Sequence, residues 1–221
     1  MKAKRYAVFL VGLFISSLAV SVITRADLGT SPISAIPYVL SLAFPFTLGQ
    51  FTIAFSLVLI LLQILMLRKR FRPEHLLQIP ISVAFGYFND LTMIFVAHIP
   101  MPSYPVKVGF LLAGCALLAF GVYLEMIADV AMLPGESFVR AVTQVFHTDF
   151  GLTKVCFDVG MTVTAGILSV VLISVLSGVR EGTAVAAVVV GLIARVFKRT
   201  AGTDALSVRC GAACILRNKR E

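Results

Sequence analysis

The sequence predicts an all-α, polytopic membrane helical bundle of about six transmembrane helices, arranged as two inverted three-helix repeats. The composition is 59% hydrophobic and only 14% charged, with a mean hydropathy of +0.98. A soluble globular protein is about half apolar and about a quarter charged. Apolar segments of the length that crosses a bilayer core also recur along the chain. A third observation, an internal duplication, predicts how these segments are arranged.

The duplication consists of two stretches with the same pattern, 102 positions apart. In each stretch an apolar segment ends at Ala-Asp, once at Ala26-Asp27 and again at Ala128-Asp129, and a proline follows five residues after the aspartate. Because three spans per copy is an odd number, the second copy would enter the bilayer from the opposite face, as in many transporters. We therefore expect one integral membrane domain with a first three-span repeat, a second three-span repeat and a cytoplasmic tail, at 1–100, 101–200 and 201–221.

The predicted spans are long apolar segments with few internal charges. The first one is longer than the core of a signal peptide and has no convincing cleavage site, so we expect it to be retained as a span. The six predicted spans are Tyr6–Thr24, Leu48–Leu67, Leu76–Ala97, Val106–Met126, Lys154–Leu176 and Thr183–Phe197.

A short, proline-containing stretch after the first and fourth spans predicts a half-helix in each copy. Thr30 or Ser31 can cap a helix that opens at Pro32, because proline at the first helical position loses no needed N–H. Pro134 opens the equivalent helix in the second copy, with Glu136 in the first turn, where a negative charge is favourable. The apolar spacing also fits a helix lying along the membrane surface, so the sequence leaves open whether these helices enter the bilayer.

Basic residues predict that both termini are cytoplasmic. Lys and Arg near short loops are retained on the cytoplasmic side, and the clusters at 2–5, 68–72 and 198–199 share one side if there are six spans. The net charge of +8 reflects Lys and Arg at the ends of the apolar segments, where membrane topology places them. We therefore expect the lipid bilayer as a partner, and no nucleic acid.

Ionisable residues inside the predicted spans are candidates for ion coupling, because a charge in the bilayer is unfavourable unless it is paired or faces water. We predict this role for Asp90, Asp158 and Lys154. Asp90 aligns with Arg195 across the repeats. Lys154 and Asp158 are four residues apart, which also fits a simple ion pair at the end of a helix.

The N-termini of the half-helices are the predicted substrate-binding site. Free N–H groups and the positive end of the helix dipole can hold an anionic group there. The copies differ at this site, since Ser34 and Tyr38 stand where the second copy has Glu136 and Arg140. The candidate residues are Gly29, Thr30, Ser31, Gly135, Glu136, Ser137 and Arg140.

No enzyme, cofactor or metal site is expected. The histidines lie near span ends without the carboxylate or cysteine partners of a catalytic centre. The four cysteines form neither a zinc pattern nor a disulfide framework. Phosphate-loop and dinucleotide-binding motifs are also absent from the sequence.

Several short motifs centred on glycine and proline bear on the family. They are Ala26-Asp-Leu-Gly-Thr-Ser-Pro32, Phe46-Thr-Leu-Gly-Gln50, Gly86-Tyr-Phe-Asn-Asp90 and Leu133-Pro-Gly135, together with the basic loop at 68–72. In these motifs the chain resembles the bacterial YczE/YitT-type integral membrane proteins over most of residues 5–200. The resemblance implies a protein of the bacterial inner membrane with a duplicated core, and it carries over no catalytic residues.

Two functions stay open. The first is a small-solute or ion-coupled transporter with its site between the two repeats. The second is a non-transporting membrane scaffold, or an assembly partner of another protein. A membrane-embedded enzyme is a third and weaker reading. The partner would be a small solute, a membrane protein or a second copy of the chain.

Overall fold

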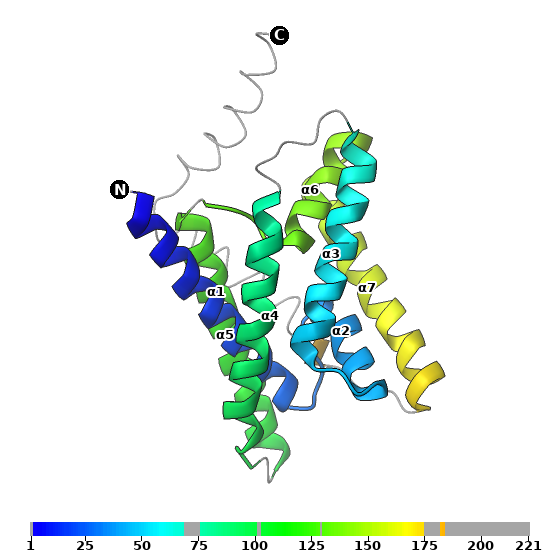
Figure 1. The fold of residues 1–221 in the computed structure, drawn as a ribbon. Coiled ribbons are helices and arrows are strands. Elements are labelled where there is room, and N and C mark those ends of the chain that lie inside the picture. The colour runs from blue at the N-terminus through cyan, green and yellow to red at the C-terminus, as the bar shows by residue number, and fades with distance from the viewer. Residues whose placement is uncertain (1, 69–75, 101–102, 129, 175–181, 184–221) are drawn as a thin grey trace, which may run out of the picture.

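The computed structural model describes residues 2–68, 76–100, 103–128, 130–174 and 182–183. Within these residues the chain forms helices and no strand, and five of the helices are long and apolar enough to cross a membrane. The prediction of a polytopic membrane bundle is therefore confirmed. The sixth predicted span, apart from Thr183, and the tail lie outside the described residues. The helices are α1 (Lys2–Arg25), α2 (Pro32–Ala43), α3 (Leu48–Leu67), α4 (Gln78–Ala97), α5 (Tyr104–Ala128), α6 (Pro134–Phe146) and α7 (Phe150–Ile173) (Figure 1).

Helices α1 and α5, the first helix of each predicted repeat, pack against one another in antiparallel directions. A Cβ added to Gly12 would lie 3.0–3.1 Å from residues 124 and 125 of α5, and one added to Gly114 would meet residues 22 and 23 of α1. Each of these positions in α5 equals its counterpart in α1 plus 102. The contacts therefore repeat when the two copies are exchanged. This symmetry supports an inverted repeat, while the boundary near residue 100 stays a prediction.

The two half-helices, α2 and α6, lie inside the bundle with their N-termini together. Both pack against α3 and α7, α2 near the first half of α3 and α6 near its second half (Figure 1). A Cβ on Gly135, in the first turn of α6, would lie 3.0 Å from Cδ1 of Ile33, in the first turn of α2. The C-termini lead into the starts of α3 and α7 at opposite ends of the bundle. This arrangement favours half-helices that enter the bilayer over helices that lie flat on its surface.

The side chains between the helices are unusually polar, while the outward faces are apolar. The outward residues of α3 and α7 include Leu61, Leu65, Val163 and Val171, all exposed, which suits contact with lipid tails. On α1, α3 and α4 the buried polar residues recur at helical spacing, so each of these three helices turns one polar face inward. They are Ser16, Ser17, Ser21 and Thr24 on α1, Thr52, Ser56 and Gln63 on α3, and Gln78, Ser82, Asn89 and Thr92 on α4.

Candidate functional site

The candidate residues of the first half-helix are held by contacts with the chain around residue 182. Gly29 has a φ of +137°, which favours glycine, and a Cβ there would lie 2.6 Å from the backbone nitrogen of Thr183. The Thr30 N–H donates to Oγ1 of Thr183 at 3.3 Å, and the Gly182 N–H donates to the Leu28 carbonyl at 2.8 Å. Gly29 and Thr30 thus join the start of α2 to the start of the sixth predicted span.

Ser31 occupies the N-cap position of α2, one of the two positions expected from the sequence. Its hydroxyl donates to Oγ of Ser34 at 3.0 Å and makes no capping bond to a backbone N–H. The expected side-chain cap is therefore wrong. The helix instead begins at Pro32, which has no backbone N–H and so leaves no donor unsatisfied at the first helical position.

The N-terminus of the second half-helix carries a buried hydrogen-bond network that includes Ser137. The Ser137 hydroxyl donates to Oε1 of Gln63 at 3.1 Å and accepts from Nε2 of Gln78 at 2.7 Å. Nε2 of Gln63 also donates to the Pro134 carbonyl at 3.1 Å. The network ties α3, α4 and α6 together. Gln63 and Gln78 are not among the residues predicted from the sequence, because that prediction rests on ionisable residues within the spans.

Electrostatic interactions link carboxylates from three helices near α6. Nζ of Lys154 donates to Oδ1 of Asp158 at 2.8 Å, which confirms the ion pair expected from their spacing. Glu136 lies within electrostatic range of both residues. Glu125 of α5, 8% exposed, accepts a 2.7 Å hydrogen bond from the Ser16 hydroxyl and lies within electrostatic range of Glu136. We call Glu125, Glu136, Asp158 and Lys154 the carboxylate cluster.

Two other residues of the predicted site, Arg140 and Gly135, are not part of the carboxylate cluster. Nη1 of Arg140 donates to Sδ of Met132 at 3.5 Å. Gly135 is buried against Ile33, where its lack of a side chain lets the two half-helices meet.

Glu125 is not among the predicted site residues, because the sequence places it at the end of a span. In the structure α5 continues to Ala128 and buries it.

Asp90, a predicted ion-coupling residue, caps the neighbouring helix α3. Its Oδ2 accepts from the Thr47 hydroxyl at 2.7 Å, and its Oδ1 accepts from the Gly49 N–H at 2.8 Å. The carboxylate thus lies at the positive end of the α3 dipole and satisfies a backbone donor there. These contacts explain Asp90 structurally, and its part in ion coupling stays a prediction.

Asp90→Ala should lower the free energy of unfolding by about 1–2 kcal/mol, as loss of a helix cap does. Asp90→Asn keeps an oxygen acceptor and should lower it less. Unfolding in mixed detergent micelles, followed by helical circular dichroism, measures both variants. An Asp90→Ala protein as stable as the wild type would contradict the capping role.

Asn89 of α4 is fully buried, and its side-chain nitrogen and oxygen have no hydrogen-bond partner in the described part of the chain. Its neighbour Thr92 is well satisfied, with hydroxyl contacts to Ser21 at 2.7 Å and to Ser17 at 3.2 Å. A buried amide without partners destabilises a protein by about 1–3 kcal/mol. Asn89 is therefore a candidate for contact with a polar guest in the bundle.

Comparison with known protein families assigns the chain to a family. A family of unknown function, DUF6198, matches residues 3–199. The chain belongs to this family. No curated protein and no solved structure matches it. The finer resemblance to YczE/YitT-type proteins stays a prediction.

The described residues of this DUF6198 protein contain no group of three or more His, Cys, Asp or Glu side chains that could hold a metal ion. Within them, Cys115 is buried on α5 and Cys156 is exposed on α7, both as free thiols. Cys210 and Cys214 lie outside the described residues. The site offers helix dipoles, buried amides and hydroxyls, and the carboxylate cluster.

Proposed function

We propose that this DUF6198 protein is a membrane transporter that moves a small polar solute through the interior of the bundle. The observation that carries the proposal is the meeting of the α2 and α6 N-termini between α3 and α7. Each helix brings the positive end of its dipole to the same region, where it attracts a negatively charged or polar group. Half-helices that meet within a bundle of spans form the binding sites of many secondary transporters.

The buried polar faces and the carboxylate cluster support the same function. Polar side chains inside a membrane-spanning bundle are unfavourable unless they are paired or face water. A polar interior is therefore characteristic of a path for a solute or an ion. The side-chain amide of Asn89 lies buried without a hydrogen-bond partner among the residues that the structure describes, as expected for a group that binds a transient guest. Carboxylates within a span are frequent members of proton relays, and Glu125 and Asp158 would supply ion coupling.

Flux through the purified protein in liposomes tests the proposal, with Asn89→Leu as the decisive variant. Removal of the unpaired amide should leave the free energy of unfolding unchanged or higher. The same change should lower solute uptake at least about tenfold, which corresponds to about 1.4 kcal/mol. Uptake is measured across a panel of labelled small carboxylates, amines and neutral polar solutes.

Thr92→Val is the matched control, one turn away on the same helix. It removes hydroxyl contacts to Ser17 and Ser21, so it should lower stability but leave uptake per folded molecule unchanged. Full uptake by Asn89→Leu would contradict a path past Asn89. A wild-type protein that moves no solute in the panel, and that co-purifies with one stoichiometric membrane partner, would favour the scaffold function.

A further inference from the structure

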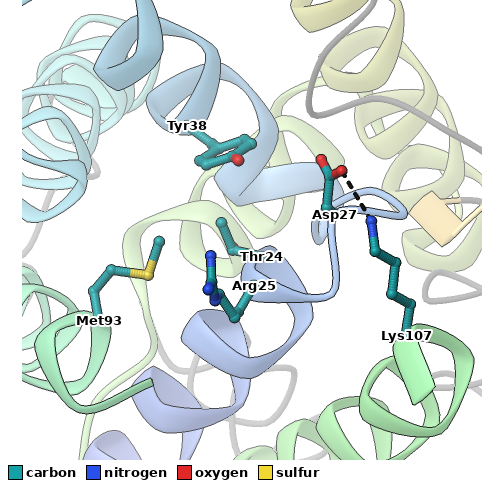
Figure 2. A pocket seen from close by; sticks show the side chains of 6 residues that line it. All are labelled: Thr24, Arg25, Asp27, Tyr38, Met93 and Lys107. Carbon is teal, nitrogen blue, oxygen red and sulfur yellow. Dashed lines mark hydrogen bonds and ion pairs between the residues drawn. The ribbon is translucent and has the colours of Figure 1, made fainter. Parts of the chain in front are cut away.

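A cleft of about 360 Å³ opens at the C-terminal end of α1, away from the carboxylate cluster. Figure 2 shows its side chains around a common space, with Asp27 joined to Lys107. They come from the end of α1 and the turn after it, and from α2, α4 and α5. The lining residues are Thr24, Arg25, Asp27, Tyr38, Met93 and Lys107.

The cleft carries one positive charge that no carboxylate of the described residues balances. Nζ of Lys107 lies 3.3 Å from Oδ2 of Asp27, so these two charges neutralise one another. Arg25 donates from Nη2 to the Ile99 carbonyl at 3.1 Å, and its Nε has no hydrogen-bond partner among the described residues. A guanidinium has five N–H donors and is always charged, so Arg25 retains donors for an anionic ligand.

A second unpaired donor lies next to Arg25. Thr24 is 3% exposed, and its hydroxyl has no hydrogen-bond partner in the described part of the chain. The Thr24 hydroxyl and the Arg25 guanidinium therefore stand at one wall of the cleft with hydrogen-bonding capacity unused. A carboxylate supplies two acceptor oxygens and matches the planar guanidinium.

The other walls select among anions. The Tyr38 ring and the Met93 side chain give an apolar surface, and the volume is at the low end of the range of about 300–1,000 Å³ for small-molecule sites. With Lys107 held by Asp27, the described lining residues leave the positive charge of Arg25 to face the ligand. This favours a monocarboxylate with an apolar group over a dicarboxylate or phosphate.

We infer that this cleft, with Arg25 and Thr24 as ligand donors and Tyr38 and Met93 as apolar walls, binds a small organic monocarboxylate. The site belongs to one copy of the repeat, because Ile127 and Arg140 stand 102 positions after Arg25 and Tyr38. A one-sided recognition site would lie at one mouth of the path. That the bound carboxylate is also the transported solute rests on the proposed function; its binding does not.

Calorimetric titration of the full chain in nanodiscs of zwitterionic lipid tests the site without transport. Sodium benzoate and sodium butyrate should bind saturably at one site, and neutral benzamide and sodium phosphate should not. Arg25→Gln should weaken carboxylate binding about tenfold to a hundredfold, as loss of a charged hydrogen bond does. Thr24→Val should weaken it severalfold, and it provides the answer if Arg25→Gln does not fold.

Arg5→Gln is the matched control at the other end of α1. Nε of Arg5 donates to the Ala128 carbonyl at 2.9 Å, so the same change of charge at a helix end should leave carboxylate binding unaltered. Failure of both carboxylates to bind, equal binding of phosphate, or undiminished binding by Arg25→Gln and Thr24→Val would each overturn the inference. Binding without flux in liposomes would overturn only the proposed transport. Flux without carboxylate binding would overturn only the site.

Discussion

Gly121→Ala is expected to lower the free energy of unfolding by about 3 kcal/mol, near the upper end for overpacking. At Gly121 the α5 backbone touches the α1 backbone. An added Cβ would collide with Oγ of Ser16 and would lie 2.8 Å from the Ser16 nitrogen and 3.1 Å from the Gly12 carbonyl oxygen. Backbone atoms cannot rotate out of the way, so α1 and α5 must separate. Unfolding in mixed micelles, followed by circular dichroism, measures the change.

Gly109→Ala provides the control within the same helix. A Cβ at Gly109 meets no described residue within 4 Å, so alanine should raise stability by up to about 1 kcal/mol through its higher helix propensity. Equal effects of the two substitutions would show that α1 and α5 do not pack as described. The pair of variants thus tests the contact on which the inverted repeat depends.

Glu125→Gln is expected to reduce proton-coupled uptake at least about tenfold while the fold is kept. Glutamine has nearly the shape of glutamate, and its amide oxygen can still accept the hydrogen bond from Ser16. The amide cannot exchange a proton, so net flux driven by a pH gradient should fall. Exchange of labelled for unlabelled solute needs no net proton movement and should persist. Both are measured in the same liposomes.

Asp90→Asn tests whether the coupling role belongs to Glu125 or to Asp90, a carboxylate in a different spanning helix. Asp90 accepts hydrogen bonds from Thr47 and Gly49, so its amide variant should keep proton-coupled uptake. Loss of coupling in Asp90→Asn together with full coupling in Glu125→Gln would reverse the assignment. The ion-coupling role predicted for Asp90 from the sequence would then be correct.

The polar residues show where sequence reasoning fails. Asp90 and Glu125 are both carboxylates within apolar segments, and by sequence Asp90 is the stronger candidate for a functional role. The structure gives Asp90 a capping role in α3 and places Glu125 within electrostatic range of a second carboxylate, Glu136. The difference depends on which helix lies opposite each side chain. The residues that contact Asp90 and Glu125 are far from them in the sequence.

The sequence by itself determined the membrane-spanning helices, the starts of the half-helices and the ion pair in α7. The span Leu48–Leu67 and the half-helix starts at Pro32 and Pro134 were predicted as observed. Hydrophobic length, proline geometry and spacing within one helix are local properties, so the sequence contains them directly. The tertiary structure alone decided that the half-helices meet N-terminus to N-terminus, which polar groups remain unpaired and where the cleft beside Arg25 lies. These features arise between distant segments, and many packings of similarly apolar helices satisfy the same local pattern.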